Sequence, residues 1–150
     1  MTTSRARVAY AELRALSAPM AQPVGNAHQQ WPRRAGLLLR LVDEEGAVGL
    51  GEASPLPGYS ADELASCTAR LQEVRWSALD LELVETPEEA PGVLGFVPAT
   101  TRALARLPPA ARCAAETALL TLLACRRAVP LATLLRGAAP PAAVPVSALL

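Results

Sequence analysis

The sequence contains no lysine, so all fourteen of its basic residues are arginines. Fourteen acidic residues balance them, and the formal net charge at pH 7 is zero. This balance gives no electrostatic reason to expect a nucleic acid or an anionic membrane as a partner. A reaction that needs a lysine as its general base would find no candidate in this chain.

Aromatic residues and histidine are also scarce. The chain has two tryptophans, two tyrosines and one phenylalanine, whereas apolar residues make up 51% of it. We therefore expect an aliphatic core of alanine, leucine and valine, which a chain of 150 residues is long enough to bury. The single histidine, His28, has no carboxylate or cysteine close to it in sequence, which favours an ordinary polar residue over a metal ligand.

No apolar run approaches the roughly 18 residues that a membrane-spanning helix needs. The first residues, Met-Thr-Thr-Ser-Arg-Ala-Arg, lack the apolar centre of a secretory signal. The three cysteines (Cys67, Cys113 and Cys125) are an odd number without a C-x-x-C pair, which favours buried structural thiols over a metal or redox site. We therefore expect a cytoplasmic protein without a membrane partner.

Three stretches of sequence predict the strands of a sheet. Residues 5–16 alternate only partly, which favours a strand without excluding a helix. Residues 37–43 form an apolar run that ends in a polar turn at 43–46, and residues 47–53 return as the second arm of a hairpin. Prolines and a glycine break any regular pattern across residues 17–32, so a loop is predicted there.

Glycines and prolines dominate the end of this hairpin and the stretch after it. Gly49 and Gly51 alternate along the strand and leave one of its faces bare, which marks the close approach of another backbone or of a ligand. Pro55 and Pro57 each fix φ, so residues 54–60 form a stiff, extended loop. Two interpretations of this loop stay open on the residues alone: a lid over a binding pocket, or a turn that covers a hydrophobic core.

The second half of the chain is predicted to be helical. A capping box at residues 60–63 begins the first helix, whose apolar stripe follows i, i+3, i+4 and i+7 spacing: Leu64, Cys67, Thr68, Leu71 and Val74. Short helical segments are predicted at 86–89, 98–107 and 129–135. The longest helix, at 110–127, is apolar nearly all round and is therefore expected to be buried on several sides.

The acidic residues form no catalytic cluster that the sequence can identify. Asp43, Glu44 and Glu45 lie on the hairpin turn, where solvated carboxylates are the ordinary finding. Glu116 is the one acid on the longest helix, and a contact with solvent or with another domain is favoured over a functional role. The residues therefore predict no catalytic group and no metal ligand.

Two stretches resemble one family. The run Arg-Ala-Gly-Leu-Leu-Leu-Arg-Leu at 34–41 and the run Gly-Leu-Gly-Glu-Ala-Ser-Pro-Leu-Pro-Gly-Tyr-Ser at 49–60 are similar to the amino-terminal capping domain of o-succinylbenzoate synthases, in the enolase superfamily. Residues 110–120, 129–131 and 134–137 are similar to the helical segment that leads into the barrel of these enzymes. The resemblance implies an α+β fold in which a three-stranded antiparallel meander is followed by a helical bundle.

The resemblance also implies how the chain is divided. Residues 1–137 are expected to form the capping domain, and residues 138–150 a Pro/Ala linker and the start of the first barrel strand. A (β/α)₈ barrel takes about 200 to 250 residues, so we expect the barrel to be absent from this truncated chain. Thr121 stands where similar sequences usually carry an acid, a departure that bears on how the longest helix would dock onto a barrel.

By resemblance, the function is that of a substrate-closing cap in a Mg²⁺-dependent carbon–oxygen lyase, which dehydrates a cyclohexadiene carboxylate through an enediolate in menaquinone biosynthesis. The corresponding loop of the family closes over the substrate, and the loop between the first two strands is a mobile flap. The predicted substrate-binding residues are therefore those of the loop: Ser54, Pro55, Leu56, Pro57, Gly58, Tyr59 and Ser60. The partner is then a small-molecule carboxylate. Mg²⁺ and the catalytic groups belong to the barrel, so this chain alone is expected to be inactive.

Two alternatives to this function stay open. Related racemases and epimerases share the same cap, so the chain is also compatible with one of these activities. The other alternative is a stand-alone, non-catalytic binding or interaction module descended from such a cap. A cap separated from its barrel would expose apolar surface, so self-association is expected as well.

Overall fold

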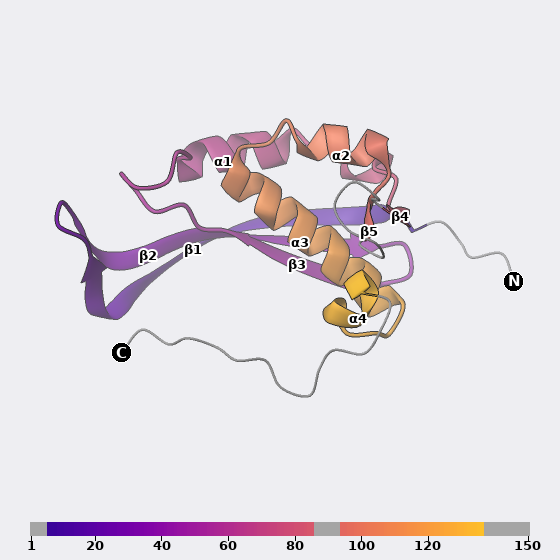
Figure 1. Cartoon of the computed structure of the whole chain (residues 1–150), viewed down its shortest axis with the longest axis horizontal. Coiled ribbons are helices and arrows are strands. Elements are labelled where there is room, and N and C mark those ends of the chain that lie inside the picture. The colour runs from indigo at the N-terminus through magenta and orange to yellow at the C-terminus, as the bar shows by residue number, and fades with distance from the viewer. Residues whose placement is uncertain (1–5, 86–93, 137–150) are drawn as a thin grey trace, which may run out of the picture.

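A three-stranded antiparallel sheet begins the structure. The computed structural model describes residues 6–85 and 94–136 of the chain (Figure 1). The strands β1 (Val8–Gly25), β2 (Gln30–Asp43) and β3 (Val48–Ala53) lie in the sheet in the order β1-β2-β3. Each strand pairs with the next one along the chain, so the predicted meander is confirmed.

Helices make up most of the second half of the described chain. The first helix, α1 (Leu64–Gln72), is followed by a 3₁₀ turn, η1 (Trp76–Ala78), and a pair of short antiparallel strands, β4 (Leu83–Glu85) and β5 (Leu94–Phe96). Three further helices follow: α2 (Pro98–Leu104), α3 (Pro109–Arg126) and α4 (Leu131–Arg136). In Figure 1, α1 and α2 lie above the strands of the large sheet, and α3 crosses in front of them.

The predicted α+β class is confirmed, and four of the predicted helical segments correspond to α1, α2, α3 and α4. The short pair β4–β5 was not predicted, because three residues are too few to show a period. The helical segment predicted at 86–89, the start of a barrel strand predicted within 138–150 and the predicted domain boundary between 137 and 138 lie outside the described residues.

The hairpin of β1 and β2 is much longer than the sequence predicts. The prediction of a loop at 17–32 is therefore wrong. Pairing continues from Ala15 opposite Leu37 to Gly25 opposite Gln30, with an irregular register between Pro19 and Val24. The prolines of β1 are tolerated because β1 is an edge strand with a bulge, where a missing N–H interrupts no essential ladder bond. The turn itself occupies only a few residues.

The turn between β2 and β3 is fixed to the end of α3 by a buried carboxylate. Asp43 is 3% exposed, and its Oδ1 accepts hydrogen bonds from the backbone N–H groups of Glu45 (2.9 Å) and Ala47 (2.7 Å). Arg126 at the end of α3 donates from Nη1 to Asp43 Oδ2 at 2.7 Å and from Nη2 to Glu45 Oε1 at 2.6 Å. Asp43 is therefore not the solvated acid that the sequence suggests.

The bare glycine face of β3 lies against the backbone of α3. A Cβ added at Gly49 would lie 1.9 Å from the Ala118 carbonyl oxygen, and one added at Gly51 would lie 1.9 Å from that of Ala114. The close approach that these glycines predict is therefore made by a helix. At the edge of β3, Thr121 Oγ1 lies 3.0 Å from the Leu50 amide nitrogen and 3.1 Å from the Leu50 carbonyl oxygen.

Two of the three cysteines differ from the prediction. Cys67 in α1 is fully buried, and burial raises the pKa of its thiol. Cys113 and Cys125 are exposed on α3, because the sheet covers only part of that helix. None of the helices in the described part of the chain is long and apolar enough to cross a membrane.

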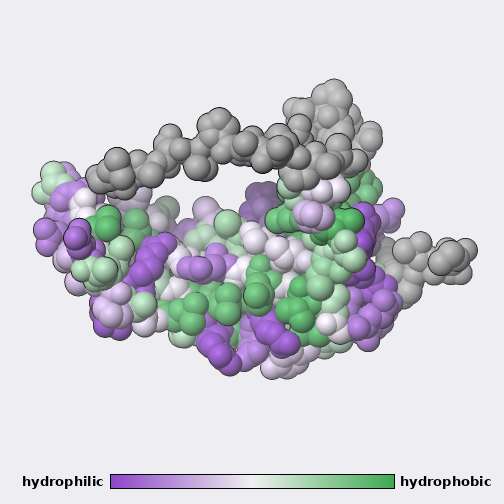
Figure 2. All heavy atoms as spheres, turned by 90° about the horizontal axis from the view of Figure 1, so that it is seen from below, coloured by the Kyte–Doolittle hydropathy of each residue, from purple (hydrophilic) through white to green (hydrophobic). Residues whose placement is uncertain are grey.

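Apolar side chains are also exposed on the face of the sheet that α3 leaves free. Leu50 points away from the glycine face of β3 and is 46% exposed, and Tyr10 on β1 is 53% exposed. Seen from below, opposite α1 and α2, apolar patches alternate with charged side chains (Figure 2). The expected self-association stays a prediction.

Candidate functional site

The predicted substrate loop, residues 54–60, is closed on itself by hydrogen bonds. The N–H groups of Tyr59 (3.1 Å) and Ser60 (2.9 Å) donate to the Leu56 carbonyl, and the Leu56 N–H donates to Ser60 Oγ at 2.9 Å. Gly58 has a φ of 72°, a left-handed conformation that suits glycine. The loop is therefore a defined turn with its own internal bonds.

The predicted capping box is wrong. The helix α1 begins at Leu64, and its N-cap, Glu63, makes no capping hydrogen bond with its side chain. The Ser60 hydroxyl is used within the loop instead. Asp62 binds the N-terminus of α3, where its Oδ2 accepts the Ala110 N–H at 2.5 Å. The spacing of Ser60 and Glu63 predicts a cap on α1, whereas the Asp62 carboxylate caps α3 through a residue 48 positions further along the chain.

The outer end of the long hairpin contacts this loop through two side chains. Trp31 on β2 donates from Nε1 to the Pro57 carbonyl at 3.0 Å, and its ring meets that of Tyr59 edge to face, with centroids 6.4 Å apart. The guanidinium of Arg34, also on β2, donates to the Ser54 carbonyl. We call residues 29–34 together with residues 54–60 the hairpin–loop surface.

A third contact at this surface lies between the turn of the loop and the Gln29 side chain. A Cβ added at Gly58 would lie 2.5 Å from Gln29 Oε1, which an exposed glutamine can relieve by moving, so glycine is favoured here by its φ of 72°. The turn of the hairpin is held by Asn26, whose Oδ1 accepts the N–H groups of His28 and Gln29 at 2.9 Å each. His28 thus lies on an exposed turn, as an ordinary polar residue would.

The seven predicted substrate-binding residues differ in exposure. Pro55 is buried, and Ser54, Leu56 and Ser60 are half-buried. The tip of the loop, Pro57 to Tyr59, is exposed, and the Tyr59 side chain is 72% exposed. One part of the loop therefore packs on the domain while its tip presents an aromatic ring to solvent. That these residues bind a substrate stays a prediction.

The sequence did not single out the residues that hold the loop. Trp31 and Arg34 were overlooked because their partners are backbone carbonyls 26 and 20 residues away, which no local pattern marks. A usable signal was present: Trp31 is one of only two tryptophans and lies in an otherwise polar stretch. It is 7% exposed in a segment whose neighbours are exposed.

The described residues do not fit a metal ion. No group of three or more histidines, cysteines, aspartates and glutamates among residues 6–85 and 94–136 could hold one. Glu116 forms an ion pair with Arg112 one turn earlier on α3, at 2.7 Å. The hairpin–loop surface can cover a ligand, exclude water from it and offer it an aromatic ring, but it brings together no acid and base for a reaction.

Sequence comparison supports the resemblance. The family model described as "MenC, N-terminal domain" matches residues 8–97. The o-succinylbenzoate synthase of Thermosynechococcus vestitus (strain NIES-2133 / IAM M-273 / BP-1) is 35% identical over 91 residues. These residues are 60% of this chain and 28% of the synthase, so the chain matches less than a third of that relative's length.

Solved structures extend the likeness beyond the family match. The dipeptide epimerase from Methylococcus capsulatus, complexed with Mg and the dipeptide L-Arg-D-Lys, has a TM-score of 0.66 and 27% identity over 85% of this chain and 34% of its own. A member of the enolase superfamily from Listeria innocua has a TM-score of 0.62 and 22% identity over 86% of this chain and 33% of its own, which shows the fold alone. The chain belongs to the MenC N-terminal domain family and is an o-succinylbenzoate synthase-like amino-terminal domain of the enolase superfamily.

Proposed function

We propose that this chain is the substrate-closing cap of an o-succinylbenzoate synthase-like lyase, in which its 54–60 loop covers a small carboxylate. The observation that carries the proposal is the hydrogen bond from Trp31 Nε1 to the Pro57 carbonyl. Together with the bond from Arg34 to the Ser54 carbonyl, it joins the loop to the hairpin end. Two segments that the family uses near the substrate are thus held as one unit.

The chemistry of the loop suits this role. Residues 54–60 carry no charged side chain, and their exposed tip ends in the ring of Tyr59. An uncharged cover keeps water away from a reacting carboxylate without competing for its charge. Two prolines and the contacts from Trp31 and Arg34 order the loop before a ligand arrives, which reduces the entropy lost on binding.

The acid–base groups of the proposed lyase would lie in its barrel, as would the Mg²⁺, which stabilises the negative charge of the enediolate. The role that we propose for this chain is one of positioning: it closes the site, orients the substrate and excludes water. The described residues offer no metal cluster, and no catalytic step is assigned to them.

The second candidate function is that of a cap in a related epimerase, and the structural similarity to the dipeptide epimerase supports it. Its structure is similar to this chain at a TM-score of 0.66, and the match covers 85% of the chain. The cap would do the same work there, with a dipeptide in place of the cyclic carboxylate. The contacts within the hairpin–loop surface do not distinguish the two substrates.

A chimera tests the proposal. Residues 8–97 of this chain would replace the matching segment of the Thermosynechococcus vestitus synthase, and steady-state kinetics would be measured with the synthase substrate and with dipeptides. Trp31→Phe keeps a ring but removes the donor to the Pro57 carbonyl, so we expect KM to rise about fivefold, as for one lost hydrogen bond. Trp76→Phe, in η1, is the matched control and should leave KM unchanged.

Three results are decisive. A rise in KM for Trp31→Phe alone supports a cap over the substrate. Unchanged kinetics beside a lowered melting temperature would show that the contact is only structural, and would overturn the proposal. Because the synthase barrel supplies the acid–base groups, the two enzymes are distinguished by affinity: a KM for the synthase substrate far above that of the unmodified synthase, beside inhibition by dipeptides, would keep the cap role and replace the lyase by an epimerase.

A further inference from the structure

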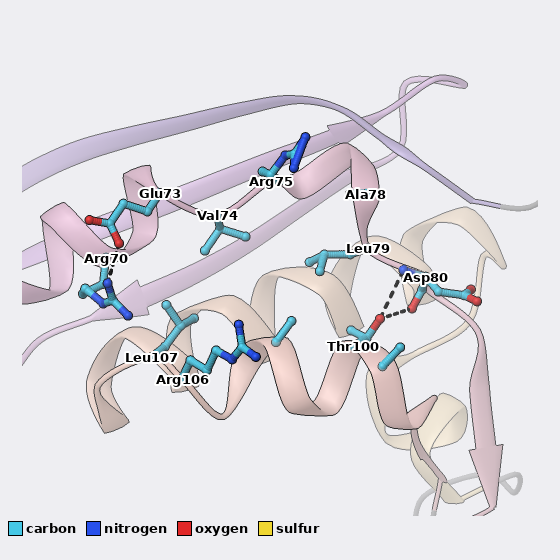
Figure 3. Close-up of a pocket in the computed structure, with 12 residues that line it drawn as sticks. Arg70, Glu73, Val74, Arg75, Ala78, Leu79, Asp80, Thr100, Arg106 and Leu107 are labelled. Carbon is cyan, nitrogen blue, oxygen red and sulfur yellow. Dashed lines mark hydrogen bonds and ion pairs between the residues drawn. The ribbon is translucent and has the colours of Figure 1, made fainter.

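A groove of about 390 Å³ lies between the end of α1, the turn η1 and the near side of α2 (Figure 3). Apolar side chains line most of it: Val74, Ala78, Leu79, Ala99, Ala103 and Leu107. Its volume is in the range of pockets that hold small molecules. None of its lining residues belongs to the hairpin–loop surface, so it is a separate site.

One end of the groove is fixed by a buried threonine. Thr100 in α2 is 1% exposed; its Oγ1 donates to the Asp80 carbonyl at 2.7 Å and accepts the Asp80 N–H at 3.1 Å. Figure 3 shows these two bonds linking α2 to the segment after η1, with the Asp80 carboxylate turned away from α2. The walls are therefore held at their spacing before a ligand enters.

Three arginines and two acids line the groove, which leaves one positive charge in excess, and Figure 3 shows one of these arginines, Arg75, turned away from α2. At the end opposite Asp80, Arg70 forms an ion pair with Glu73 at 2.5 Å, so these two charges cancel. Within the described residues, no carboxylate forms an ion pair with Arg106, which lies in the turn that follows α2. Figure 3 shows the Arg106 guanidinium in the space between α1 and α2, beside the apolar lining.

We propose that this groove binds a small amphipathic carboxylate, with its apolar body against Val74, Leu79 and Leu107 and its carboxylate at Arg106. A guanidinium donates to a carboxylate through two parallel N–H groups, which fixes orientation as well as charge. Because Arg106 is exposed, its ion pair should add only about three- to fivefold to the affinity. The proposal does not depend on the cap function.

Nuclear magnetic resonance of the ¹⁵N-labelled 150-residue chain tests this inference. The chain would be titrated with 2-naphthoate and, separately, with the uncharged 2-naphthamide of the same shape. We expect saturable shifts of the amide signals of Val74, Leu79 and Ala103, with naphthoate binding about three- to fivefold more tightly. Arg106→Gln should remove this preference. Arg102→Gln, which changes an exposed arginine of α2 outside the groove, should keep it.

A second variant fills the groove. Ala103 is exposed on α2, so Ala103→Leu should leave the core intact and block both probes. Equal affinities of the two probes for the unmodified chain would overturn the proposal. So would a preference for naphthoate that survives Arg106→Gln, or shifts confined to the free face of the sheet. Arg106→Gln alters only an exposed charge, so this comparison does not depend on how Ala103→Leu folds.

Discussion

The two ends of the long β1–β2 hairpin are held in different ways. At one end, Leu39 and Leu41 are 0% exposed, and α3 approaches β3 so closely that the helix backbone occupies the space of two missing Cβ atoms. At the other end, residues 21–30 are all exposed, and Trp31 is the buried side chain nearest the turn. Packing fixes the first end, whereas a few hydrogen bonds fix the second.

This difference indicates where the domain can change without unfolding. A region with many buried contacts opens only when the whole domain opens, while a region held by single hydrogen bonds opens at small cost. The hairpin–loop surface is of the second kind. A cap that admits and releases a ligand needs a segment that opens at small cost, attached to a scaffold that stays folded. In the proposed cap, the hairpin–loop surface would be that segment.

The largest effect is expected at the packed end. Gly51→Ala would place a Cβ 1.9 Å from the Ala114 carbonyl oxygen, so α3 and β3 must move apart. We expect the free energy of unfolding to fall by about 3 kcal/mol. Leu50→Ala, one residue away on the exposed face, should cost about 1 kcal/mol or less and is the control. Urea unfolding measures both, and equal losses would show that the close approach is not what fixes this end.

A smaller effect is expected at the turn between β2 and β3. Burial alone would raise the pKa of Asp43, but hydrogen bonds from Arg126, Ala47 and Glu45 outweigh it and hold the pKa below its ordinary value. Asp43→Asn should therefore cost about 2 kcal/mol at pH 7, as for charged hydrogen bonds at a buried site. Glu44→Gln, exposed in the same turn, should cost little.

The pH dependence checks the cause. Because the folded pKa is lowered, the carboxylate contributes stability above the unfolded pKa of about 3.9 and loses it as the pH falls through the folded pKa. The difference between the unmodified chain and Asp43→Asn should therefore shrink below about pH 4. A difference that stays constant from pH 7 to pH 2 would mean that charge is not involved.

The smallest effect on stability is expected at the loop. Replacing Pro55 or Pro57 with glycine frees one φ angle, at about 1 kcal/mol or less each, with the larger cost at buried Pro55. Hydrogen exchange of the Trp31 indole N–H should become faster in Pro57→Gly, while the amides of β3 keep their protection. In a protein that carries a barrel, the double variant should weaken substrate affinity by up to about thirtyfold and spare Mg²⁺ binding.

The opposite result would reassign the loop. A lowered melting temperature with unchanged substrate constants would make residues 54–60 part of the scaffold, which is the alternative that the residues alone leave open. Faster exchange throughout β3 in Pro57→Gly would show that the two ends of the hairpin are not independent.

Sequence predicted the packed end well because its signals are local and periodic. The apolar run of β2, the glycines of β3 and the continuous apolar surface of α3 each indicate burial, and together they predict a helix on a sheet. The outer end was predicted poorly. Prolines predict the end of a strand, whereas an edge strand with a bulge accommodates them.

The missed contacts share one property: their partners are distant in the chain. Arg126 binds Asp43 across 83 residues, and Asp62 caps a helix that begins at Pro109. The family resemblance located the 54–60 loop but not the residues that hold it. Trp31 and Arg34 bind backbone carbonyls. Because every residue has a backbone carbonyl, the residue type does not show which carbonyl accepts a hydrogen bond.

The hydroxyl of Thr121 has a consequence for the solubility of the domain. The outer edge of a sheet is a template on which a strand of another molecule can add, and proteins avoid fibre formation by covering it. The Thr121 hydroxyl accepts the N–H of Leu50 at 3.0 Å, and its one hydrogen faces three carbonyl oxygens, those of Thr117 at 2.8 Å and of Ala118 and Leu50 at 3.1 Å each. A carboxylate could accept the same N–H but has no hydrogen to offer these carbonyls. At this point of β3, threonine therefore occupies the N–H that a further strand would need without placing a negative charge against carbonyl oxygens.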